Sequence, residues 1–230
     1  MPLRILFFGT PAFAVPSLQA LAASPHTVTG VVCQPDRPRG RGHKVQIDAV
    51  KAAALDRGFP IWQPEKLKDP ALLDALRAQA PDLAVVAAYG RLLPQVLLDL
   101  PRLGFINVHG SLLPRWRGAA PVHRAILAGD STSGVTIMRV VLALDAGPML
   151  AKVETPIAPE ETSVALEARI ATLGADLLAA VVDRLAAGPV PEAPQDEAAA
   201  TYARKLERAD SDINWAASAQ HIHNQIRGLH

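Results

Sequence analysis

The sequence predicts an α/β protein with a doubly wound, mostly parallel, Rossmann-like sheet. Short apolar runs alternate with segments of helical periodicity along most of the 230 residues, which is the pattern of a parallel sheet with crossover helices. Several of these runs are almost continuously apolar, as in strands that are covered on both faces. We expect this unit to span residues 1–186, followed by a linker over 187–200 and the start of a further domain over 201–230.

The chain opens with a strand, a helix and a second strand. Leu3–Phe8 is apolar apart from one arginine and ends at a Gly-Thr-Pro turn, so we predict a buried strand. Phe13–Ala23 has an apolar helical face, and Val28–Cys33 forms the next strand. The first turn contains one glycine where a dinucleotide-binding turn needs three, which argues against a nicotinamide or flavin site.

A basic loop follows the second strand. Arginine and lysine crowd this Pro/Gly-rich segment at Arg37, Arg39, Arg41 and Lys44. We expect neither a ladder nor a helix there before about Asp48. Such a loop suits contacts with phosphate, because arginine forks onto phosphate oxygens. A solvated surface loop is the alternative.

The remaining elements follow from apolar periodicity and capping signals. Asp69 before Pro70 predicts a capped helix start, and the helix after the basic loop should turn Val50, Ala53, Ala54 and Leu55 inward. The predicted helices cover Asp48–Arg57, Pro94–Leu98, Ala119–Ala128 and Thr162–Leu185. The predicted strands cover Ile61–Trp62, Asp82–Ala88, Thr132–Val141 and Met149–Ile157.

The most informative stretch follows a short apolar run that ends at Ile106. Asn107 and His109 alternate with apolar residues at the end of this strand, so their side chains point the same way. Ligands of open α/β sheets bind at such carboxyl ends. Asp145 lies in a turn between two later strands. An ordinary core histidine beside a loop asparagine is the competing interpretation.

The segment Asn107–Gly118 reads N-V-H-G-S-L-L-P-R-W-R-G. It resembles the signature of enzymes that transfer a formyl group from 10-formyltetrahydrofolate. The turn at Gly9–Leu18 and the Q-P-D-R-P-R-G-R-G loop at 34–42 are similar to those of the members that act on methionyl-tRNA. Residues 201–230 resemble the start of that family's second domain, a small β-barrel.

The resemblance implies an enzyme that formylates the α-amino group of initiator methionyl-tRNA, with 10-formyltetrahydrofolate as co-substrate and no metal. It implies catalytic roles for Asn107, His109 and Asp145. It implies folate contacts from Ser111, Leu112, Leu113 and Pro114, and tRNA contacts from Arg37, Arg39, Arg41 and Lys44. The chain departs from the family pattern at Ala143 and Ala146, where the family has Gly and Thr.

Two other functions remain open on sequence grounds. A related enzyme could use the same donor on an amino-sugar nucleotide, or hydrolyse the donor. A non-catalytic folate- or nucleotide-binding module belongs to another class. The basic loop favours the tRNA acceptor over a sugar nucleotide, and the Asn–His pair with a downstream Asp favours an enzyme over a binding module.

Composition limits the partners and the cellular compartment that we expect for this protein. The net charge of +1 carries no global signal for a polyanionic partner, and the single cysteine, Cys33, excludes an intrachain disulfide framework. The apolar run at the N-terminus is too short for a signal peptide. No apolar run in the sequence approaches the roughly 20 residues that a membrane helix needs. We therefore expect a cytoplasmic monomer with no membrane partner.

Overall fold

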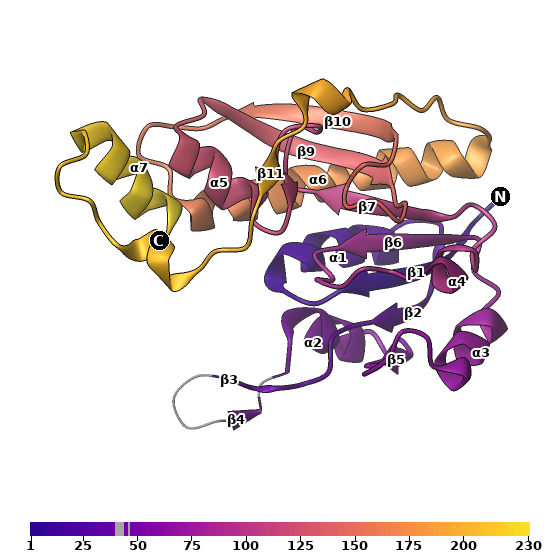
Figure 1. Ribbon diagram of the computed structural model, residues 1–230. Helices are drawn as coiled ribbons and strands as arrows, with labels where there is room; N and C mark the ends of the chain where they lie inside the picture. The colour runs from indigo at the N-terminus through magenta and orange to yellow at the C-terminus, as the bar shows by residue number, and fades with distance from the viewer. Residues whose placement is uncertain (40–43, 46) are drawn as a thin grey trace.

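A seven-stranded sheet in the order β10-β9-β7-β6-β1-β2-β5 organises the molecule (Figure 1). The computed structural model describes residues 1–39, 44–45 and 47–230. The strands are β1 (Arg4–Gly9), β2 (Thr27–Val32), β5 (Ile61–Trp62), β6 (Leu83–Ala87), β7 (Phe105–His109), β9 (Thr132–Arg139) and β10 (Met149–Pro156). Strands β5, β2, β1, β6 and β7 pair in parallel, whereas β9 runs antiparallel to both β7 and β10. The mostly parallel, doubly wound sheet is confirmed.

Helices cover both faces of the sheet. They are α1 (Val15–Ala23), α2 (Ala49–Asp56), α3 (Pro70–Ala78), α4 (Gln95–Leu98), α5 (Pro121–Ala128), α6 (Ser163–Ala187) and α7 (Ala219–Gly228). In β1, Ile5 and Phe7 join the core beneath α1 and α6, while Leu6 and Phe8 join a second core beneath α3 and α4. This alternation is what a strand buried on both faces requires.

Helix ends follow the predicted caps. The Asp69 carboxylate accepts a hydrogen bond from the Ala71 N–H, and the Thr162 hydroxyl accepts one from the Ala165 N–H. Helix α5 ends at Gly129, whose φ of 78° places it in the left-handed region that glycine adopts without a Cβ penalty.

Two expectations, one for the basic loop and one for the helix that follows it, are wrong. Strands β3 (Pro38–Arg39) and β4 (Lys44–Val45) pair antiparallel, so a ladder forms before Asp48. A strand pair of this length carries no apolar alternation that a sequence could reveal. In α2, Leu55 is 53% exposed although Val50 and Ala54 are fully buried, because the helix buries a narrower stripe than its composition suggests.

The chain after α6 stays on the surface of the sheet unit. Ala193 forms a bridge with Met149, and a short 3-10 helix covers Glu197–Ala199. Strand β11 (Tyr202–Ala203) pairs in parallel with β8 (Arg117–Gly118), and α7 packs against α5 (Figure 1). The proposed boundaries at 187 and 201 remain predictions.

Within the described part of the chain, no helix has the length and apolar character needed to span a membrane.

Candidate active site

Strand β7 presents Asn107 and His109 on one face. Phe105, two residues before Asn107, belongs to the core under α3 and α4, while Ile106 and Val108 point to the opposite core. The period of two therefore places Phe105, Asn107 and His109 in a row on the α4 side of the strand. Asn107 is partly exposed and His109 is 5% exposed.

The imidazole of His109 is held by the main chain. Its Nε2 lies 2.8 Å from the carbonyl oxygen of Trp116. A carbonyl only accepts hydrogen bonds, so Nε2 carries the hydrogen and donates it. The other nitrogen, Nδ1, is thus the one directed to Asp145. Trp116 itself has a φ of 64°, an uncommon conformation for a residue with a side chain.

Asp145 lies beside the ring. Its Oδ2 is 3.7 Å from Nδ1 of His109, and its side chain is 14% exposed. This distance is longer than a hydrogen bond and suits a charge interaction or one bridging water. The same Oδ2 accepts a 2.8 Å hydrogen bond from the Gly118 N–H. Asp145 also has a positive φ, 48°, and such conformations often occur at functional sites.

The loop between His109 and Trp116 is fixed by its own polar groups. The Ser111 hydroxyl donates to the Arg115 carbonyl at 2.6 Å, and the buried Thr136 hydroxyl donates to the Ser111 carbonyl at 2.7 Å. Ser111 is 1% exposed and Leu113 fully buried. The expected folate contacts from Ser111, Leu112, Leu113 and Pro114 stay a prediction, because these side chains chiefly shape the turn.

Arg115 and Trp116 are anchored on Asp130. The Arg115 guanidinium forms two hydrogen bonds with the Asp130 carboxylate, at 2.6 and 3.0 Å, and lies 4.4 Å from the Trp116 ring centroid. The Trp116 indole N–H also donates to Asp130, at 2.8 Å. The Asp130 carboxylate raises the pKa of Arg115 above its usual value, and the two hydrogen bonds hold the guanidinium beside the Trp116 ring.

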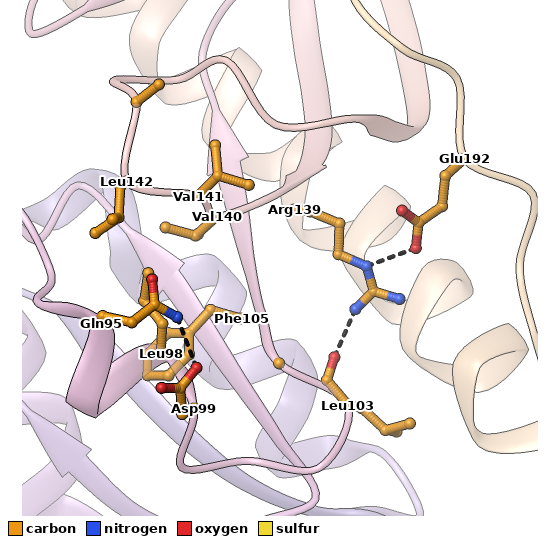
Figure 2. A pocket seen from close by; sticks show the side chains of 12 residues that line it. Gln95, Leu98, Asp99, Leu103, Phe105, Arg139, Val140, Val141, Leu142 and Glu192 are labelled. Atoms are coloured by element: carbon orange, nitrogen blue, oxygen red, sulfur yellow. Dashed lines mark hydrogen bonds and ion pairs between the residues drawn. The ribbon is translucent and has the colours of Figure 1, made fainter.

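A cavity of about 690 Å³ opens on the same face of β7 (Figure 2). The Val140 N–H bonds the Phe105 carbonyl, and the chain then reaches Asp145 beside His109. The loop over 140–145 therefore runs along the row of Phe105, Asn107 and His109. The side chains of Leu98 and Phe105 line the cavity on one side and those of 140–143 on the other.

The site includes residues that sequence reasoning missed. Arg117 is 1% exposed and forms a two-pronged ion pair with Glu197, at 2.7 and 2.9 Å. Gln195 contacts both Arg117 and the turn of Asp145. Nothing in the Pro/Ala/Glu-rich composition of 187–200 indicates such contacts. Gln195 and Arg117 are far apart in the sequence and meet only in the folded chain.

The basic loop lies away from this cavity. Its base is fixed by Asp36, which pairs with Lys51 and accepts a 2.9 Å hydrogen bond from Gln63. The Lys51 ammonium, helped by Gln63, holds the pKa of Asp36 below its usual value. Arg37 is exposed, Arg39 and Lys44 lie on β3 and β4, and Arg41 falls outside the described residues. The hairpin projects beyond α2 (Figure 1).

Among the described residues, no group of three or more His, Cys, Asp or Glu side chains could hold a metal ion.

Comparison with known proteins defines the class. A family model described as formyl transferase matches residues 3–182, which is most of the chain. An N-formyltransferase from Helicobacter canadensis, solved with folinic acid and dTDP-3-aminofucose, has the same fold. Its TM-score is 0.76 at 19% identity, covering 100% of this chain and 81% of that chain. The chain therefore has the fold of a formyltransferase and belongs to that class of protein.

Curated relatives define the family more narrowly. The chain is 51% identical over 228 residues to a methionyl-tRNA formyltransferase of Stutzerimonas stutzeri, covering 99% of this chain and 73% of the relative. It is 49% identical over 227 residues to one of Moorella thermoacetica, with the same coverage of 99% and 73%. The chain belongs to the methionyl-tRNA formyltransferase family and is an enzyme that transfers a formyl group to methionyl-tRNA.

Proposed function

We propose that Asn107, His109 and Asp145 perform this transfer, with 10-formyltetrahydrofolate as donor and the α-amino group of initiator methionyl-tRNA as acceptor. The observation that carries the proposal is the approach of Asp145 Oδ2 to His109 Nδ1, 3.7 Å, at the carboxyl end of β7. Open α/β sheets bind their ligands at this end.

Acyl transfer to an amine sets the chemical roles. The amine nitrogen bonds to the formyl carbon and loses a proton, while the donor's N10 gains a proton as its bond to that carbon breaks. Negative charge develops on the formyl oxygen between these events. The partly exposed amide of Asn107 offers a neutral N–H donor for that charge.

His109 and Asp145 supply the acid–base groups. The Trp116 carbonyl fixes the ring of His109 through Nε2, which leaves Nδ1 beside Asp145. Nδ1 can accept a proton and, once protonated, can stabilise the oxyanion or pass that proton on. The Asp145 carboxylate stabilises positive charge on the ring and accepts the amine proton through water. In the hydrolase triads a carboxylate orients the histidine, whereas here a main-chain oxygen does so.

The cavity in Figure 2 suits the pterin part of the donor. Leu98, Phe105 and Val140 provide flat apolar surface for an aromatic ring, and main-chain groups at 140–143 provide polar atoms at its edge. Phe105 at the start of β7 lines the cavity, and Asn107 follows two residues later on the same face of the strand. A bound ring would therefore direct its formyl group along the strand towards the amide. The folinic acid bound by the Helicobacter canadensis relative, a formylated tetrahydrofolate, supports a folate donor.

The basic loop is proposed to bind the acceptor end of the tRNA. Of the four cationic residues in 37–44, Arg39 and Lys44 lie on the two strands of a projecting hairpin, and the pairing of Asp36 with Lys51 holds the base of that hairpin to the sheet unit. Cations on such a loop neutralise phosphates without reading base sequence. A cytoplasmic monomer suits this role, and the buried, free Cys33 is consistent with a reducing compartment.

One assay tests the function. The enzyme is incubated with 10-formyltetrahydrofolate and methionyl-tRNA, and formylmethionine is measured by mass spectrometry. We expect wild-type activity, and a loss of at least about a hundredfold in kcat for Asp145→Ala, the scale of general acid–base catalysis. Asp56→Ala, an exposed carboxylate at the end of α2, serves as the control. Full activity of the Asp145 variant would contradict the assignment.

A further inference from the structure

Residues 193–203, here called the crossing segment, lie over the loops that carry the active-site groups. Ala193 exchanges two main-chain hydrogen bonds of 2.8 Å with Met149, just after the turn of Asp145. The Thr201 carbonyl accepts a 2.8 Å hydrogen bond from the Arg117 N–H. The crossing segment is therefore attached both to the Asp145 turn and to the loop that holds His109.

Gln195 lies where these attachments meet. Its Nε2 donates to the carbonyl oxygens of Asp145 and Gly147, each at 2.8 Å. Its Oε1 accepts from Nε of Arg117 at 3.0 Å. One side-chain amide thus uses both its N–H groups on the Asp145 turn and its oxygen on the neighbouring loop.

The partner of Gln195 is itself rigidly held. Arg117 is 1% exposed, and its two terminal nitrogens bind the Glu197 carboxylate at 2.7 and 2.9 Å. Glu197 belongs to the same crossing segment, and its carboxylate raises the pKa of Arg117 while its own pKa is lowered. A fixed guanidinium therefore defines where the Gln195 amide can lie.

The Asp145 turn needs such support. Asp145 has a φ of 48°, which residues with a side chain rarely adopt unless the surroundings hold them there. The Gly118 N–H holds its carboxylate at 2.8 Å, and Gln195 holds its carbonyl. A Cβ at Gly147 would lie 1.9 Å from the Arg139 carbonyl oxygen, so the turn also lies against β9 and has little freedom to change.

We propose that Gln195 is a positioning residue for formyl transfer. By joining the carbonyls of Asp145 and Gly147 to Arg117, it keeps the Asp145 carboxylate beside Nδ1 of His109. It acts through Asp145 and touches neither substrate, so the inference rests on the proposed role of that carboxylate. The family model ends at residue 182 and does not include Gln195.

The test compares two substitutions of similar size. Gln195→Met keeps the volume and removes every hydrogen bond. Gln195→Glu keeps an acceptor for Arg117 but replaces the N–H groups that face the two carbonyls with oxygen. We expect both variants to lower kcat by roughly ten- to a hundredfold, as small misplacements of a reacting group do. We expect KM for donor and tRNA within about twofold of wild type, the scale of unchanged ground-state binding.

Two further measurements separate positioning from simple stability. The pH profile of kcat should change shape in both Gln195 variants, because the carboxylate moves relative to the ring. Thermal melting identifies variants that fail to fold. Gln220→Met is the matched control, since the exposed Gln220 donates to Asn224 within α7 and makes the same exchange of side chain away from the crossing segment, and it should keep the wild-type kcat and pH profile.

Each outcome decides the matter. Wild-type kcat in folded Gln195→Met overturns the inference, and so does full rescue by Gln195→Glu, because anchoring to Arg117 would then suffice. If Gln195→Met fails to fold, Gln195→Glu alone decides. Asp145→Ala is measured in parallel: an active Asp145 variant contradicts the proposed function, whereas an inactive one beside an active Gln195→Met contradicts only the positioning role.

Discussion

At the scale of single residues, the two nitrogens of the His109 imidazole have different partners: the main chain binds one, and the other faces Asp145. The Trp116 carbonyl accepts a hydrogen bond from Nε2 of His109, and the Gly118 N–H donates one to Oδ2 of Asp145. The accepting carbonyl and the donating N–H both belong to the main chain of one short loop. The backbone geometry of this loop therefore contributes directly to the relative position of imidazole and carboxylate.

Asn107 allows a sharp test of the oxyanion role. Replacing Asn107 by Ala removes an N–H donor from the partly exposed end of β7, and we expect kcat to fall by about a hundredfold, the scale of one lost oxyanion donor. The melting temperature should stay close to wild type, because the amide serves the reaction rather than the core. Unfolding seen by circular dichroism would instead show that Asn107 is a structural residue.

At the scale of elements, one carboxylate fastens the chain after the crossing segment to α5. Asp210 binds the Arg124 guanidinium with two hydrogen bonds, at 2.8 and 3.0 Å, and also pairs with Arg204. These contacts, with Arg124 first, hold the pKa of Asp210 well below its usual range. The 3-10 helix at Arg208–Ser211 and the following α7 thus depend on an ionised side chain.

The depressed pKa gives a pH dependence with a definite sign. Above the ordinary pKa of an aspartate, about 3.9, the Asp210 contacts contribute their full stability, and this is lost as the pH falls towards the lower folded value. Asp210→Asn should therefore melt below wild type at pH 7, with the gap narrowing as the pH falls below about 4. Asp212→Asn, two residues on and exposed, is the control. A gap independent of pH would contradict the ion pair.

At the scale of the whole molecule, the regions proposed to bind the acceptor and the donor lie apart. The basic hairpin projects beyond α2, while the cavity lies at β7 and α4 (Figures 1 and 2). We expect Arg41→Ala to lower tRNA formylation while donor binding stays near wild type. Affinity for tRNA should fall with salt at a log–log slope of about −0.9 per phosphate contact, and the variant should show a shallower slope. Equal loss of donor binding and formylation would mean that the loop shapes the active site.

The sequence predicted the fold where patterns are long. Leu3–Phe8 and the strand that ends at His109 were identifiable because apolar runs end at glycine or polar residues, and the structure confirms them as β1 and β7. The resemblance grouped Asp145 with His109 as catalytic candidates, and the structure places Asp145 Oδ2 3.7 Å from Nδ1 of His109. The pairing of β8 with β11 could not be predicted, because two-residue strands have no periodicity.

The crossing segment has a consequence for biosynthesis. Gln195 follows Arg117 by 78 positions, and Thr201 follows Trp116 by 85. A ribosome makes the chain from its N-terminus, so the strand that bears Asn107 and His109 emerges long before the residues that hold the neighbouring loops. We expect the sheet to form first on the nascent polypeptide, and the loops that carry the catalytic groups to gain their contacts with the crossing segment only after that segment has emerged. We therefore expect the enzyme to become active only after its hydrophobic core has formed.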